Sequence, residues 1–418
     1  MTYDFDHIVD RTGSDDIKHG ALQTLFGRQD LLPLWVADMD FETPPFITNA
    51  LRHRLDHSLF GYTMTPEAFW ESIQRWILFH HSWDVRREWL TYIPGIVKGI
   101  GMVVNVFVGT DERVIIQPPV YHPFRLTPLG NKREVVMNPL LPQYASDGRL
   151  TGYEMDFDGL EVLAHDPKNR LLILSNPHNP AGITWSKDTL ARVADICAAN
   201  NVLVISDEIH CDMTIFGHRH IPFASVSETA AQISITFGAP SKTFNIAGIV
   251  SSYAIVPNDA LRAQFFRWLE ANELDSPTLF APIATIAAFS EEGEEWRCQM
   301  LRYIEENICF VENFCRERMP EVHPLRPQAS FLVWLDCRAL QLSHKALIDL
   351  FVNQARLALN DGEMFGIGGE GFMRMNVASP RSIIAEALER LHAALHSTQH
   401  TLSSCKKNES SSSTTSAL

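Results

Sequence analysis

The stretch ITFGAPSKTFNIAG (235–248) decides how this chain of 418 residues is interpreted. The run ISITF (233–237) has the continuous apolar pattern of a buried strand, and a turn rich in Gly, Ala, Pro, Ser and Asn follows it. Small residues of this kind let the backbone approach a bound group closely. Because Lys242 lies in that turn, the stretch predicts a strand followed by a lysine that forms a Schiff base.

Three further runs resemble the strand before Lys242. Each is short, apolar and β-branched without alternation, as expected for strands that are covered on both faces: RVIIQ (113–117), LLILS (171–175) and VLVIS (202–206). Helical patterns lie between the runs, for example at 187–201, which ends at an Asn pair. Strand and helix repeated in this way predict a mostly parallel α/β sheet.

The sequence changes character along the chain. Residues 294–319 have the pattern of one long amphipathic helix, and the alternating strand candidates SFLVWLD and FMRMNVA follow. The last residues are Ser/Thr-rich and cannot bury enough apolar surface to offset the entropy of ordering. We therefore expect four parts, namely an N-terminal arm (1–45) that packs with the small domain, a large domain (46–287), a small α+β domain (288–396) and a disordered tail (397–418).

Composition excludes several classes of protein. The formal net charge is −15 and no long Lys/Arg run occurs, which argues against nucleic acid or an anionic membrane surface as a partner. The acidic N-terminus does not resemble a signal peptide, and the apolar runs are too short to span a membrane. Seven cysteines without a Cys-x-x-Cys pair indicate reduced thiols and a cytoplasmic protein.

Polar side chains follow each of the four strand candidates. Tyr121, Asn179, Asp207 and Lys242 come after successive runs, and His210 lies three residues beyond Asp207. Each alone has an ordinary structural explanation, such as a cap, a turn or a solvated surface residue. Because ligands bind beyond the carboxyl ends of parallel strands, their shared placement predicts one site.

These residue types are the set that holds pyridoxal phosphate. Lys242 would bond the aldehyde covalently, Asp207 would pair with the pyridine nitrogen, Asn179 would donate to the phenolic oxygen, and Tyr121 would stack on the ring. YIPGIVKGIGMVVNVFV (92–108) predicts a strand, a turn and a helix whose first amides, at Ile96 and Val97, would bind the phosphate.

A small amino-acid substrate also brings a carboxylate, for which a guanidinium is the natural ligand. Arg374 is the candidate, because a charged residue inside the strand-like FMRMNVA is uncommon. The alternative interpretation of Arg374 is a structural ion pair.

Six segments, in this order, make the chain resemble a known family: LPLWVADMDF, LFGYT, SNPHNPAG, SDEIHCD, APSKTFNIAG and FMRMNVASPR. Over roughly residues 3–395 the chain is similar to fold-type I pyridoxal-phosphate enzymes of aminotransferase classes I and II, and within them to MalY/PatB-type cystathionine β-lyases. The resemblance implies a homodimer in which Tyr62 reaches the neighbouring subunit's phosphate. It also implies that His210 lies near the ring, that Ser241 binds the phosphate, and that Lys242, Asp207, Asn179, Tyr121 and Arg374 have the roles given above.

Two positions depart from aspartate-aminotransferase-like members of the superfamily. Ala239 stands where they have serine, and Val250 stands where they have the arginine that grips the phosphate. Phosphate binding would then depend more on backbone amides, Ser241 and Tyr62 of the partner subunit. The departures weaken a strict aspartate-aminotransferase interpretation. The matching family segments favour the β-lyase, in which Lys242 or a tyrosine such as Tyr121 protonates the leaving sulfur.

Three alternatives stay open or are set aside. An aminotransferase would use the same catalytic residues, and a non-catalytic regulator could keep the fold. GIGGEG (366–371) matches a dinucleotide fingerprint, but a strand follows it and not a helix. Asp207, His210, Cys211 and Asp212 lack a recognised metal-ligand spacing, so we expect no metal.

Overall fold

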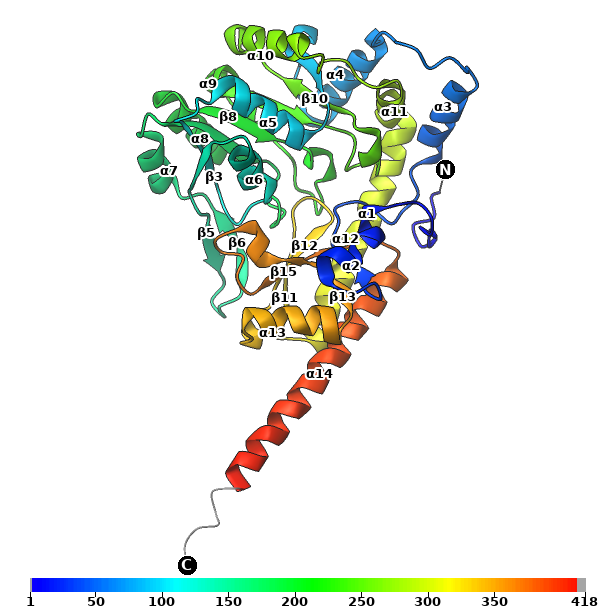
Figure 1. Ribbon diagram of the computed structural model, residues 1–418, viewed down its shortest axis with the longest axis vertical. Coiled ribbons are helices and arrows are strands. Elements are labelled where there is room, and N and C mark those ends of the chain that lie inside the picture. Colours follow the sequence, from blue (N-terminus) through cyan, green and yellow to red (C-terminus); the bar gives the residue numbers. More distant parts are fainter. Residues whose placement is uncertain (1, 412–418) are drawn as a thin grey trace, which may run out of the picture.

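A computed structural model describes the backbone of residues 2–411 and the side chains of residues 2–397 (Figure 1). Its largest sheet has seven strands in the order β2-β10-β9-β8-β7-β3-β4. Strands β9, β8, β7, β3 and β4 are parallel to one another, while β10 is antiparallel to both β9 and β2. The strands are β2 (Leu90–Ile93), β3 (Arg113–Ile116), β4 (Glu134–Met137), β7 (Asn169–Ser175), β8 (Leu203–Asp207), β9 (Ser234–Gly238) and β10 (Ser252–Ile255). The four predicted runs are confirmed as β3, β7, β8 and β9.

The apolar runs are continuous because both faces of this sheet are covered. In β7, Leu171 and Ile173 pack with helices α5 (Ile96–Phe107) and α10 (Asp259–Ala271), while Leu172 and Leu174 pack with α7 (Phe157–Ala164) and α8 (Lys187–Ala199). Alternate side chains of a strand point to opposite faces, so a strand between two layers of helices needs apolar residues at every position. The predicted α/β class with a mostly parallel, mixed sheet is confirmed.

Local signals set the ends of the helices. Helix α8 begins after Ser186, whose hydroxyl accepts a hydrogen bond from Thr189 N, and it ends before Asn200 and Asn201, the latter in the left-handed region (φ 56°). The remaining helices before residue 290 are α1 (Ile17–Gly20), α2 (Leu22–Phe26), α3 (Pro45–Leu55), α4 (Glu67–His81), α6 (Pro123–Gly130), α9 (Glu228–Ile233) and α11 (Phe280–Ala288).

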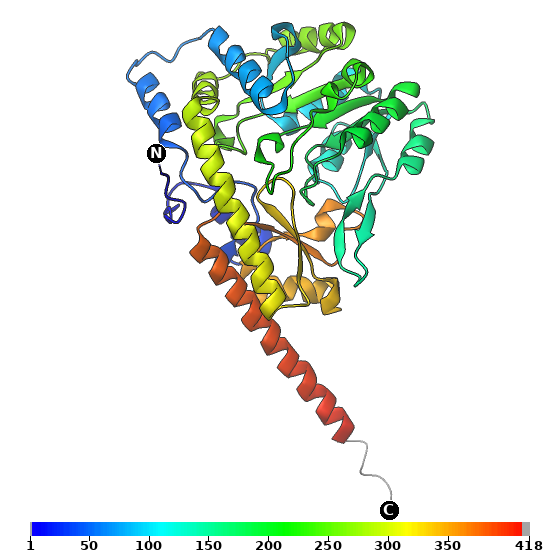
Figure 2. The same cartoon turned by 180° about the vertical axis from the view of Figure 1, so that it is seen from behind.

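A second sheet has four strands in the order β11-β12-β15-β14, all antiparallel. They are β11 (His323–Leu325), β12 (Leu332–Asp336), β14 (Asn360–Asp361) and β15 (Phe372–Asn376). Helix α12 (Glu291–Arg318) runs from the large sheet past this smaller sheet, with α14 (Arg381–Ser411) beside it (Figure 2). Helix α13 (His344–Asp349) and a hairpin of β5 (Leu141–Tyr144) and β6 (Leu150–Glu154) complete the chain.

The N-terminal arm is tied to the region of the small sheet. Its strand β1 (Leu32–Pro33) pairs in parallel with β13 (Leu357–Ala358). The two larger sheets fall on either side of residue 288, the boundary expected from sequence. The division into four parts itself stays a prediction.

The C-terminal segment differs from expectation. Helix α14 continues through residues 397–411, where the sequence predicts a disordered tail, and it extends away from the rest of the chain in both views (Figures 1 and 2). A polar segment can continue an existing helix because propagation needs no new nucleus. Residues 412–418 lie outside the described part of the chain.

Candidate active site

Four parallel strands bring the predicted polar residues to one cavity. The carboxyl ends of β9, β8, β7 and β3 meet at one edge of the large sheet, where a cavity of about 290 Å³ opens. Eight predicted site residues line this central cavity: Lys242, Asp207, Asn179, Tyr121, His210, Ser241, Ile96 and Val97. The structure therefore places these residues together as the sequence predicts, although their chemical roles stay predictions.

Lys242 is a buried amine with an unusual acceptor. Its Nζ donates a hydrogen bond to the carbonyl oxygen of Ala37 in the N-terminal arm at 2.6 Å. Burial and the positive charge of Arg374 lower the pKa of Lys242 to about 8, against the opposing charges of Asp38 and Asp207. A sizeable fraction of the amine is then neutral near neutral pH, as a nucleophile or base requires.

Asp207 ends β8 and lies inside the cavity. Its Oδ1 accepts a hydrogen bond from Ile209 N at 3.1 Å. Burial, together with the charge of Glu208, raises the pKa of Asp207 to about 7 against the effects of that hydrogen bond and of Lys242. A buried carboxyl group in this state would gain strongly from a cationic partner.

His210 faces the same space. Burial and the charges of Lys242 and Arg374 lower its pKa to about 3, so the imidazole is neutral under ordinary conditions. Its Nδ1 is buried and has no hydrogen-bond partner among the described residues. Such an orphaned polar atom is costly unless a ligand satisfies it.

Arg374 approaches the cavity from the small sheet. It is buried on β15, where NH1 donates to Oδ1 of Asn179 at 2.9 Å and NH2 donates to the carbonyl of Trp35 at 3.2 Å. Burial lowers its pKa to about 10, and its Nε has no partner among the described residues. The guanidinium thus lies next to Asn179 with a hydrogen-bond donor still to satisfy.

Tyr121 and the N-terminus of α5 form two further walls. Burial raises the pKa of Tyr121, so its hydroxyl stays protonated. Gly95 precedes α5 with a φ of 114° and has no side chain with which to cap the helix. The first amides of this 12-residue helix, from Ile96 and Val97, can therefore bind an anion.

Val250 stands where aspartate-aminotransferase-like members of the superfamily have an arginine. It lines the cavity and adopts a left-handed conformation with φ 57° and ψ 58°, which is rare for a β-branched residue. Its carbonyl accepts a hydrogen bond from the Tyr92 hydroxyl at 2.9 Å. The valine leaves the anion-binding end without that guanidinium.

Tyr62 is not part of the central cavity of this single chain. It lies in the loop between α3 and α4 and is fully exposed. Its predicted role across a subunit interface therefore depends on a second copy.

Several cavity residues were missed from sequence. The cavity is also lined by Ala37, Lys98, Ser175, Ser251 and Ser252. Lys98 could have been found, because it lies in the first turn of the helix predicted to bind phosphate. Ala37 contributes a backbone carbonyl, for which a side-chain pattern carries no signal.

The side chains of the segment SDEIHCD lie in two different environments. Asp207 and His210 line the cavity, whereas Cys211 and Asp212 lie near His81, with their possible ligand atoms within 4.8 Å of one another. His81 Nε2 and Asp212 Oδ1 already form a hydrogen bond of 3.0 Å. The four residues weighed as a metal cluster therefore separate into two environments.

Comparison with known proteins gives consistent matches. A model of the family described as aminotransferase class I and II matches residues 29–391. Cystathionine beta-lyase PatB of Bacillus subtilis (strain 168) is 41% identical over 94% of this chain and 99% of its own.

Two solved structures are similar over nearly their whole lengths. Cystalysin from Treponema denticola, which contains a pyridoxal 5'-phosphate cofactor, superposes with a TM-score of 0.90 and 34% identity, covering 95% of this chain and 100% of its own. The PLP-bound C-S lyase from Staphylococcus hominis gives a TM-score of 0.86 and 32% identity, covering 94% and 98%.

Proposed function

Because this chain belongs to the aminotransferase class I and II family, and within it groups with PatB, we propose that it is a pyridoxal-phosphate-dependent carbon–sulfur β-lyase. Its substrates would be cystathionine or related cysteine S-conjugates, cleaved to pyruvate, ammonia and a thiol. The observation that carries the proposal is the buried amine of Lys242, which has a pKa of about 8 and shares one cavity with Asp207.

The residues present fit pyridoxal phosphate. Asp207 is a buried carboxyl group without a cationic side chain bonded to it, which suits a protonated ring nitrogen. The orphaned Nδ1 of His210 and the uncapped start of α5 supply further polar groups at the cavity wall. Ser241 and the first amides of α5, from Ile96 and Val97, would bind the phosphate.

When bound, this cofactor supplies an electron sink that stabilises the charge left after a substrate loses its Cα proton. Lys242 Nζ would take that proton, since its lowered pKa leaves a useful neutral fraction near pH 7. Arg374 would bind the substrate carboxylate, and its Nε is the donor that has no partner among the described residues.

Other side chains would hold the ring and handle the leaving group. Asn179 uses its oxygen to accept from Arg374, so its amide nitrogen is the group that can donate to the ring's phenolic oxygen. Tyr121 would stack on the ring, and its hydroxyl, which stays protonated, is one candidate donor of a proton to the departing sulfur. Lys242 is the other candidate for that proton.

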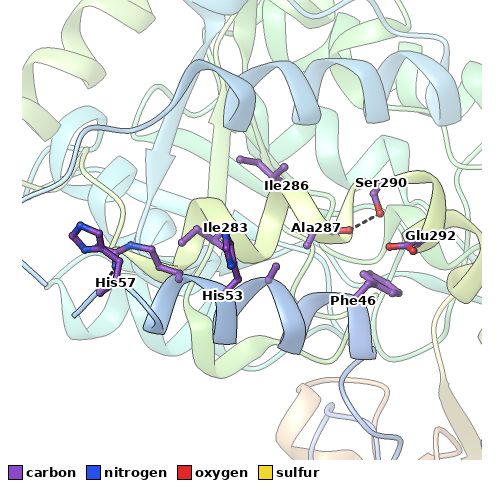
Figure 3. Close-up of a pocket in the computed structure, with 10 residues that line it drawn as sticks. Phe46, His53, His57, Ile283, Ile286, Ala287, Ser290 and Glu292 are labelled. Carbon is purple, nitrogen blue, oxygen red and sulfur yellow. Dashed lines mark hydrogen bonds between the residues drawn. The ribbon is translucent and has the colours of Figure 1, made fainter. Parts of the chain in front are cut away.

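A homodimer is part of the proposal. The loop between α3 and α4 exposes large apolar side chains, namely Leu59, Phe60, Tyr62 and Met64. Beside it lies a second pocket, of about 820 Å³, between α3 and α11, lined by Phe46, Ile283 and Ile286 among others (Figure 3). Exposed apolar side chains beside a pocket of this size suit a subunit interface, across which Tyr62 would reach its partner's phosphate.

We also propose that the enzyme works in the cytoplasm. The six cysteines within the described part of the chain are all free thiols, which suits a reducing compartment. Within the same residues the structure offers no helix with the length and apolarity to cross a membrane.

Transamination is the second candidate, because the matching family includes it by name and the same residues would serve. The experiment that decides is incubation of the purified protein, loaded with pyridoxal phosphate, with cystathionine. We expect stoichiometric pyruvate and free thiol without any added keto acid. Strict dependence of turnover on a keto acid would instead establish an aminotransferase.

A further inference from the structure

The four backbone carbonyls of residues 35–38 accept hydrogen bonds from two kinds of partner. Trp35 O accepts from Arg374, and Ala37 O accepts from Lys242, so these two carbonyls serve charged groups of the active site. The carbonyls of Val36 and Asp38 both accept from a single side-chain amide, Nδ2 of Asn376, at 2.7 and 2.6 Å. One amide thus holds the two carbonyls that flank the acceptor of Lys242.

Asn376 is built to hold this segment. It is fully buried at the end of β15, two residues after Arg374, so the two side chains leave the same face of the strand. Its side-chain Oδ1 accepts from Ala378 N at 2.8 Å, and its backbone N–H donates to Leu34 O at 2.9 Å. With its amide oxygen and nitrogen both engaged, the side chain is fixed in orientation.

We propose that Asn376 is a positioning residue for Lys242, which acts by aiming the Ala37 carbonyl at the lysine amine. The inference rests on the proposed function, in which Lys242 Nζ takes the Cα proton. An amine can accept that proton only if its lone pair points at the substrate carbon. A fixed acceptor for one N–H removes rotational freedom from the amine and directs the lone pair.

The rest of the arm is held by other contacts. Asn245 donates to the carbonyls of Met39 and Phe41 at 3.0 and 2.9 Å, and Lys18 pairs with Asp40 at 2.8 Å. Loss of the Asn376 amide would therefore loosen residues 36–38 while the arm stays attached beyond them. A defect at Lys242 is expected without general unfolding.

The chain offers a matched control in Asn307. This residue is also fully buried, and its Nδ2 donates to two backbone carbonyls, Val377 O and Ser379 O, both at 2.9 Å. Those carbonyls do not belong to the segment that contacts Lys242. Each alanine substitution removes two bonds donated to backbone carbonyls and one bond accepted by the amide oxygen, from Ala378 N at Asn376 and from the Arg381 guanidinium at Asn307, so Asn307→Ala should destabilise the fold at least as much as Asn376→Ala.

The experiment measures the titration of Lys242 in the cofactor-free chain. Reductive methylation with formaldehyde and cyanoborohydride across pH, read by peptide mass spectrometry, reports the pKa of this amine. Because a carbonyl acceptor favours the ammonium form, Asn376→Ala should lower the pKa by roughly half a unit, and Asn307→Ala should leave it unchanged. In the loaded enzyme, Asn376→Ala should lower kcat about tenfold with little change in KM.

Asn376→Ser keeps one hydroxyl donor and should fall between wild type and Asn376→Ala in both measurements. If the alanine variant does not fold, the serine variant decides by the same titration. An unchanged titration in the Asn376 variants, or an equal shift in Asn307→Ala, overturns the inference. Should wild type lack β-elimination while the titration still responds to Asn376, the proposed function fails and the positioning of Lys242 stands.

Discussion

Asp207 and Asp212 are five residues apart and both are buried, yet their pKa values are pushed in opposite directions. Burial raises the pKa of Asp207 to about 7. Burial opposes ionisation of Asp212 as well, but the hydrogen bond from His81 and nearby positive charges outweigh it and lower the pKa to about 2. The protein satisfies one carboxylate internally and leaves the other in need of a cation.

The same contrast separates two buried lysines. Lys18 is completely buried and pairs with Asp40 and Asp38 at 2.8 and 3.4 Å. Lys242 is bonded to a neutral carbonyl, and its pKa falls to about 8. Internally paired charges stabilise structure, whereas buried groups that lack a charged partner are typical of functional sites.

The strongest test of this contrast is Lys242→Ala. If Lys242 bonds the cofactor, the variant should lose the absorption band near about 420 nm that is expected of a protonated lysine–cofactor imine, and turnover should fall about 10³-fold or more. Borohydride trapping followed by peptide mapping should label Lys242 in wild type. A label on another residue, or a band that survives in the variant, would remove the enzyme assignment.

The two aspartates themselves form the next test. Asp207→Asn should lower kcat about 10²-fold, because a neutral amide cannot keep the ring nitrogen protonated. Asp212→Asn should change kcat by less than about threefold but lower the free energy of unfolding by about 3 kcal/mol, since it removes a buried carboxylate that is hydrogen-bonded to His81. Steady-state kinetics and urea unfolding measure both, and similar losses of kcat would contradict the division of roles.

The pH dependence of stability sharpens the comparison in the cofactor-free protein. Between the unfolded pKa of 3.8 and the folded pKa of about 7, unfolding lets Asp207 release a proton, so the residue costs stability as pH rises through this window. Asp207→Asn should therefore gain about 2 to 3 kcal/mol over wild type between pH 5 and pH 8. Urea unfolding at the two pH values measures the difference.

For Asp212, the contribution to the free energy of unfolding should change with pH in the opposite direction. Its folded pKa of about 2 lies below 3.8, so its contribution to stability is present above pH 3.8 and is lost as pH falls toward 2. For Asp207, the contradicting result would be a difference in free energy of unfolding between wild type and Asp207→Asn that stays constant from pH 5 to pH 8. It would show that Asp207 is ionised throughout this range.

Tyr62→Phe should have a smaller effect than Lys242→Ala or Asp207→Asn. Loss of one hydroxyl at the phosphate should weaken cofactor binding about tenfold, while the dimer seen by ultracentrifugation persists. Co-folding Tyr62→Phe with Lys242→Ala gives a decisive control. In mixed dimers one site would combine an intact Lys242 with an intact Tyr62, so a fraction of sites should regain wild-type affinity; no regain would place Tyr62 outside its neighbour's site.

Much of the fold was predictable because its signals are local. Residues 171–174 of β7 had to be apolar at every position to lie between two helical layers, and this pattern is visible without coordinates. The membership suggested by segments such as SDEIHCD is confirmed by the family match. The helical course of residues 397–411 was not foreseen, because low apolar content reports on burial and not on continuation of a helix.

In the candidate site, too, features with a local sequence signal were predictable and the others were not. The residue types that follow each strand can be read from the sequence, and they predict that Tyr121, Asn179, Asp207 and Lys242 meet, because parallel strands share a carboxyl edge. That Cys211 and Asp212 lie near His81, and that the Ala37 carbonyl accepts from Lys242, depends on how distant segments pack in the folded chain. Side-chain identity can be read from the sequence, but the direction of a backbone carbonyl and the partner of a buried charge depend on segments that lie 205 residues apart for Ala37 and Lys242 and 131 residues apart for His81 and Asp212.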